Sequence, residues 1–275
     1  MTTPSTAVPG HAAGDLPAVG DLPAGWFAPA PQAAPPARRV LAQARFDATV
    51  ILRNGEQFLI TLVLPALLLV ALALTRSPGL GAGRRIDVAV PGVLALAVMS
   101  TAFTGQAIGT GFDRRYGVLR LLGTTPLGRG GLVAGRVLAV LAVETLQVVV
   151  LGSLGLALGW HPRAGGVPAA LLAGLAGTAA FVGAGLLLAG TLRAEAVLAA
   201  ANLGWVLLLA GGGVVIPPGR LGGFAPIARL LPSGALGEAL RGALLHGSLR
   251  WGSLAVLVAW GSATAAAAVR WFHWD

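Results

Sequence analysis

Long apolar runs alternate with short polar connections along most of this chain. Six runs approach or exceed about 20 residues, the length of helix that crosses a hydrocarbon core of roughly 30 Å. These runs are 57–74, 88–109, 131–158, 168–192, 196–216 and 251–271. The pattern predicts an all-α polytopic membrane protein with six transmembrane helices within residues 56–275.

The segment before the first run has two parts. Residues 1–37 are rich in Pro, Ala and Gly, and they lack the cationic start and apolar core of a signal peptide. Such a composition buries too little surface to offset the ordering entropy, so we expect a disordered cytoplasmic tail. Residues 38–55 predict an amphipathic helix that lies in the membrane interface. On a helical projection Val40 and Ala44 fall on one side, opposite Arg38 and Arg45.

The alternative for 38–55 is a helix that simply continues into the first span. The sequence Asn54-Gly55-Glu56 disfavours it, because these residues interrupt a helix. A second non-spanning element is expected within 217–249. There a helix at 234–246 is too short to cross, which favours a re-entrant or interfacial element at the outer surface.

Composition supports the membrane assignment and excludes several chemistries. The chain is 56% apolar and 11% charged, which leaves too few charges for a soluble protein of 275 residues. It has no cysteine, so disulfides and thiolate metal sites are excluded. The net charge of +9 comes from arginine alone, because the chain contains no lysine. A phosphate-binding P-loop requires lysine, so any ATP that drives this protein is hydrolysed by another polypeptide.

The arginines lie in the short connections between apolar runs, where they meet lipid headgroups and set topology, so we expect no nucleic-acid partner. The cations before the first run and those in the second connection, 110–130, indicate the cytoplasmic side. With six spans, both termini are then cytoplasmic. Arg76, Arg84 and Arg85 in the first outer connection are a counter-signal to this orientation.

The second connection is also the best candidate for function. Phe112, Tyr116 and Leu119 follow an i, i+4, i+7 spacing among arginines, and Thr125-Pro126 ends the element. A short helix of this kind at 112–122 can insert into a partner surface and move as a lever. The alternative is a solvated cationic loop that only enforces topology.

The run 113–119, Asp-Arg-Arg-Tyr-Gly-Val-Leu, followed by Thr125-Pro126-Leu127, resembles the coupling segment of type-2 ABC exporter permeases. That family shows an acidic-Arg pair, then Gly-Thr-Leu, then Thr-Pro-Leu. The resemblance covers roughly 40–272 and includes 53–56 (Arg-Asn-Gly-Glu) and an outer segment that starts at 231. Arg115 and Val118 depart from the pattern, where the family often has an acid and a threonine.

The resemblance implies a permease subunit that is not itself an enzyme and carries no cofactor. Two such subunits, identical or similar, would pair in the bacterial cell membrane and export a hydrophobic or amphipathic compound, as in multidrug efflux. Each would rest on a separate ATP-binding cassette subunit, which holds ATP-Mg. The implied coupling residues are Phe112, Asp113, Arg114, Tyr116, Gly117, Leu119, Pro126, Arg53 and Glu56.

Three polar residues inside predicted spans complete the candidates. Glu144 is the one acid deep in a span, with Gln147 nearly one turn on, and an ionised carboxylate there must face protein or water. Glu144 could line a pathway or dimer interface, or make a buried structural hydrogen bond. Asn202 predicts an interhelical hydrogen bond. A rival function is an ion- or proton-coupled secondary transporter that uses Glu144, but the chain shows no inverted repeat. The dispersed histidines predict no metal site.

Overall fold

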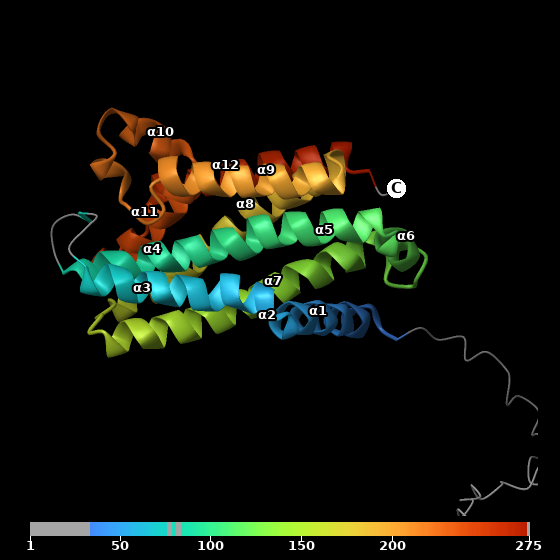
Figure 1. The fold of residues 1–275 in the computed structure, drawn as a ribbon, viewed down its shortest axis with the longest axis horizontal. Helices are drawn as coiled ribbons and strands as arrows, with labels where there is room; N and C mark the ends of the chain where they lie inside the picture. Colours follow the sequence, from blue (N-terminus) through green and yellow to red (C-terminus); the bar gives the residue numbers. More distant parts are fainter. Residues whose placement is uncertain (1–33, 76–78, 81–83, 274–275) are drawn as a thin grey trace, which may run out of the picture. The chain divides into compact units, whose positions relative to one another are not determined.

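The computed structural model describes residues 34–75, 79–80 and 84–273 (Figure 1), and all their regular structure is helical. The α-helices are α1 (Pro36–Arg53), α2 (Gly55–Phe58), α3 (Leu64–Leu74), α4 (Arg85–Met99), α5 (Gln106–Arg115), α6 (Val118–Gly123), α7 (Gly128–Ala157), α8 (Val167–Thr191), α9 (Ala194–Gly211), α10 (Ala225–Leu230), α11 (Pro232–His246) and α12 (Trp251–Trp271). Two π-helical segments are η2 (Leu59–Val63) and η3 (Ser100–Gly105), and three 3-10 turns are η4 (Ala164–Gly166), η5 (Pro218–Arg220) and η6 (Gly222–Phe224).

Among the described residues, five helices are long and apolar enough to cross a membrane. They are Arg85–Arg115, Gly128–Ala157, Ala164–Thr191, Ala194–Gly211 and Trp251–Trp271. Each corresponds to one of the predicted runs, so the all-helical, multi-pass membrane architecture is confirmed. The first predicted run forms the apolar helix Leu59–Leu74, which is shorter than the other five and follows α2 without a break.

The helix that runs from α4 through η3 to α5 lies at the centre of the bundle. In its apolar stretch 94% of the residues are buried by the rest of the chain, against 17% in α9 and 22% in α12. A helix that is apolar on all sides is stable only when its whole circumference is covered. The outer helices α9 and α12 keep apolar faces that the chain itself does not cover.

Both π-helical segments are held by one side chain of α7. Nε2 of Gln147 donates to the backbone carbonyl of Thr61 in η2, at 2.7 Å, and to Oγ1 of Thr101 in η3, at 2.9 Å. Nε1 of Trp205 on α9 donates to Oγ of Ser100, also in η3, at 2.8 Å. A π segment disturbs the regular ladder of helix hydrogen bonds, and here polar side chains from neighbouring helices contact both segments.

The predicted short helix at 234–246 is confirmed as α11, which begins two residues earlier at Pro232. It is almost entirely buried and packs against α4, α8 and α12. Arg241 fixes it to the connection after α9, because its guanidinium donates to the carbonyls of Val214, at 2.5 Å, and Val215, at 2.8 Å. Figure 1 shows α10 and α11 at the end of the bundle opposite α6.

The predicted amphipathic helix is α1, which begins at Pro36, where proline suits the first helical position. The predicted tail at 1–37 therefore extends two residues too far, and its residues 1–33 lie outside the described part of the chain. α1 packs on α7 through buried Ala44 and through Gln43, which covers Gly135. The opposite side, including Phe46, is exposed.

The tight packing of α11 generates a prediction. A Cβ at Gly234 would overlap the carbonyl oxygens of Ala228 and Gly212, whereas a Cβ at Gly252 on α12 meets no atom within 4 Å. We expect Gly234→Ala to destabilise the protein by roughly 1–3 kcal/mol, the usual range for overpacking. Thermal unfolding in detergent should show a lower midpoint for Gly234→Ala and no loss for the control Gly252→Ala. Equal midpoints would contradict this packing.

Candidate functional site

The candidate coupling segment consists of the last turn of α5, a tight turn and α6. Helix α5 ends at Arg115, and Gly117 follows with a φ of 72°, in the left-handed region that favours glycine. The chain then enters α6. The single helix predicted at 112–122 is therefore wrong. Phe112, Asp113 and Arg114 belong to the end of the central span, and only α6 is a separate short helix.

Arg136 holds this end of α5 against α7. Its Nη1 donates to Oγ1 of Thr110 at 2.7 Å, and its Nη2 forms a salt bridge with Asp113. Arg136 is 8% exposed and lies about two turns into the apolar helix α7. The sequence reasoning missed it. The available signal was a lone arginine inside an apolar run, which requires buried partners because lipid offers none.

Two arginines at the end of α5 contact the connection between α8 and α9. Nη2 of Arg114 donates to the carbonyl of Leu192 at 2.5 Å, and Arg115 forms a salt bridge with Glu195. The Arg115 pair is exposed, so its contribution to stability is small. Together with the Arg136 contact, these bonds link the end of α5 to α7 on one side and to α9 on the other.

Helix α1 completes the site. The guanidinium of Arg39 donates to the carbonyl of Pro126, just before α7, and Nε2 of Gln43 donates to Oδ1 of Asp47 at 2.9 Å. A cavity of about 200 Å³ lies between α1, α5, α6 and α7, and Asp47, Asp113 and Arg136 all line it. Burial raises the pKa of Asp47, and the hydrogen bond from Gln43 only partly opposes this shift.

The surface of the segment has three exposed apolar side chains, and Val118, at 36%, is the least exposed of them. Tyr116 is 71% exposed and Leu121 is 68% exposed, whereas Leu119 is 2% exposed. The Tyr116 ring stacks on Phe112, with ring centroids 6.2 Å apart, and the guanidinium of Arg115 lies 6.0 Å from the Tyr116 ring. The expectation that Leu119 shares one surface with Tyr116 is wrong, because the turn at Gly117 breaks the i, i+4, i+7 geometry.

The remaining predicted coupling residues lie on α1, on α2 and in the connection before α7. Arg53 is exposed in the last turn of α1, and Pro126 is exposed in the connection to α7. Glu56 belongs to α2, and its side chain lies outside the described part of the structure. The structure thus brings Pro126 next to α1 through Arg39, and no described contact joins Arg53 to α6.

Of the three polar residues inside spans, two form bonds within the chain. Oγ1 of Thr178 on α8 donates to Oε2 of Glu144 at 2.6 Å, and both residues are buried. This is the structural hydrogen bond to a neighbouring helix that the sequence left open as one alternative. Gln147 contacts η2 and η3 as described above. Asn202 is exposed on α9, and among the described residues nothing accepts from or donates to its side chain.

The histidines and acids that the structure describes do not converge on a cation site. No group of three or more His, Asp or Glu side chains that could hold a metal occurs in the described part of the chain.

Comparison with known proteins identifies the class that this architecture represents. Residues 38–245 match the ABC-2 type transporter family, and the chain therefore belongs to that family. It is a membrane component of an ABC transporter, a class of permease that works with an ATP-binding cassette subunit. No curated protein matches the chain. The family assignment does not favour the rival interpretation as a secondary transporter driven by Glu144.

The Arg136 contact generates a prediction at this site. Replacing Arg136 with Met removes a charged donor and leaves the carboxylate of Asp113 without its partner, so we expect a loss of about 1–3 kcal/mol in the free energy of unfolding. The double variant Arg136→Met/Asp113→Asn should recover part of this loss, because no carboxylate is then left unpaired. Thermal unfolding of the two single variants and the double variant measures the coupling. Strictly additive losses of unfolding free energy in the two single variants would contradict the Arg136–Asp113 pair. Arg45→Met, at an exposed position on α1, serves as the control.

Proposed function

We propose that this chain is the membrane subunit of an ATP-driven exporter and that it moves a hydrophobic or amphipathic small molecule or lipid out of a bacterial cell. The observation that carries the proposal is the α5–α6 turn. Exposed Tyr116 and Leu121 lie there beside the bonds that join α5 to α7 and to the start of α9. The chain has no lysine and hence no P-loop, so the ATP-Mg is bound by the cassette subunit.

The proposed coupling surface consists of Tyr116, Val118 and Leu121, together with the backbone of Gly117. A cassette subunit that closes on this surface would displace α6 and, through the bonded end of α5, the central span. Leu119 takes part only indirectly, because it packs inward. The predicted contacts of Arg53, at the end of α1, and of Glu56, in α2, with the cassette subunit remain part of this proposal.

We further propose that two copies of this chain, or this chain and a similar permease, form the transport pathway. The sixth span, needed for two cytoplasmic termini, would be Leu59–Leu74 extended by α2. Helix α9 supports the pairing, since most of its apolar residues are uncovered by the chain itself and Asn202 lies exposed among them. A side-chain amide in hydrocarbon favours a polar partner on another helix.

The coupling surface can be tested by a double substitution. We expect Tyr116→Asp/Leu121→Asp to reduce co-purification with the cassette subunit by about tenfold or more, because two buried apolar contacts are replaced by charges. Leu230→Asp is the control, since Leu230 is 65% exposed at the opposite end of the bundle. Affinity purification of a tagged permease, with quantification of the cassette subunit, measures the effect. Undiminished association in the double variant would remove α6 from the contact.

The orientation can be tested separately, and the absence of native cysteine makes labelling specific. We expect a cysteine at Arg120, on α6, to be protected from a membrane-impermeant maleimide in intact cells and to react after permeabilisation. A cysteine at Phe224, 43% exposed at the other end, should react in intact cells. The reverse pattern would place α6 outside and would exclude its contact with an intracellular ATPase.

A further inference from the structure

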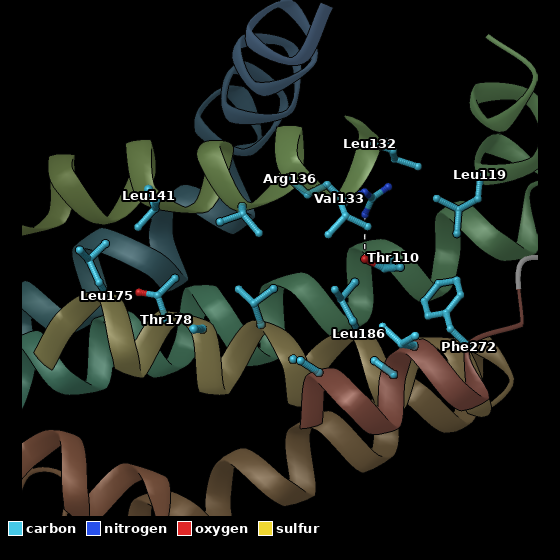
Figure 2. A pocket seen from close by; sticks show the side chains of 17 residues that line it. Thr110, Leu119, Leu132, Val133, Arg136, Leu141, Leu175, Thr178, Leu186 and Phe272 are labelled. Carbon is cyan, nitrogen blue, oxygen red and sulfur yellow. Dashed lines mark hydrogen bonds between the residues drawn. The ribbon is translucent and has the colours of Figure 1, made fainter. Parts of the chain in front are cut away.

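A cavity of about 500 Å³ lies within the membrane-spanning part of a single chain, and Figure 2 shows its position. We call it the lateral slot. It lies between α7 on one side and α8 and α12 on the other, with α5 and α6 at one end. Arg136 and Thr110 lie near the α6 end, and Thr178 lies near the middle of the span. These three are the only polar side chains among its 17 lining residues.

The length of the slot corresponds to one leaflet of a bilayer. Along α8 it runs from Leu175 to Leu186, which is roughly 16 Å at the 1.5 Å rise per helical residue. A hydrocarbon core of about 30 Å leaves roughly 15 Å for the acyl chains of each leaflet. The slot therefore extends from near the α6-side surface of the membrane to its centre, the depth that one lipid acyl chain occupies.

The slot is open to lipid. Leu175 is 53% exposed and Val269 is 89% exposed, although both line it. At this depth the surrounding solvent is acyl chains, and an apolar cavity in contact with them gains dispersion contacts when a chain enters. Water is a poor occupant, because the slot has only three polar side chains and its two threonine hydroxyls are already bonded to Arg136 and to Glu144.

The α6 end carries an excess of cations that favours an anionic headgroup. Outside α1, six arginines lie in the turns and helix ends on this side, against Asp113 and Glu195 among the described acids. The six are Arg114, Arg115, Arg120, Arg129, Arg193 and Arg270. Basic residues at a membrane surface attract anionic lipids. Arg136 adds a buried Nε–H that lacks an acceptor within the described chain, next to where a lipid ester or phosphate group would lie.

We propose that the lateral slot binds one acyl chain of an anionic phospholipid from the leaflet on the α6 side, with the headgroup at the cationic end. The bound chain fills the space between α7 and α12. This site lies inside one subunit and does not depend on which compound is exported or on how two copies pair.

The test uses a phosphatidylglycerol that carries a diazirine midway along one acyl chain, incorporated into liposomes with the purified protein. After irradiation, we expect labelled peptides from the slot faces of α7, α8 and α12. Ala265→Trp places an indole in the slot and should reduce this labelling by roughly fivefold or more, a difference of about 1 kcal/mol. Ala266→Trp is the matched control, because Ala266 is also exposed on α12 but does not line the slot.

A second variant tests the slot independently, in case Ala265→Trp impairs folding. Ala179→Phe fills the slot from the neighbouring helix α8 and should reduce labelling in the same way. Both variants should elute and unfold like the parent protein. Undiminished labelling of the slot peptides in both variants would overturn the proposal. A phosphatidylcholine with the same diazirine chain should label the slot several-fold less, and equal labelling by the two lipids would overturn the assignment to an anionic lipid.

Discussion

A guanidinium inside an apolar helix must find its partners within the protein, because the hydrocarbon around it offers none. Arg136 meets this requirement with a hydroxyl and a carboxylate from the last two turns of the central helix. The arrangement at the α6 end depends on this contact. Once Asp113 is held, the following residues Arg114 and Arg115 reach the start of α9, and Tyr116 is left to project from the end of the bundle.

The same constraint explains why polar side chains in the middle of the bundle bond to one another. Two π-helical segments occur in apolar helices of the bundle, and polar groups of η2 and η3 accept from Gln147 on α7. A third helix joins through Trp205, which donates to Ser100. These bonds gather the polar contacts of α7 and α9 at the two π-helical segments. π segments recur at functional sites, and here η3 immediately precedes α5, the helix that leads to α6.

The sequence predicted the elements better than their contacts, for a physical reason. Hydropathy determines which segments can cross a bilayer, so five predicted runs correspond to the long helices, and α11 was placed within two residues. Side-chain partners depend on which helices become neighbours. The pairing of Arg136 with Asp113, or of Gln147 with Thr61, could not be inferred from spacing along the chain. The predicted exposure of Leu119 was wrong for a local reason. The helical projection assumed that Gly117 would continue the helix, whereas its φ of 72° redirects the chain.

The bonds at the α6 end also limit how a displacement of α6 could spread. Arg39 joins α1 to the loop before α7, and the α5 contacts reach both α7 and the start of α9. The central helix is packed on nearly all sides, so it cannot bend locally without opening voids, and it would move as a rigid body. The outer helix α9 is the least covered of the long helices and is free of such packing over most of its surface. A push on Tyr116 would therefore move the central helix as a unit, and through Arg114 and Arg115 it would also reach the start of α9.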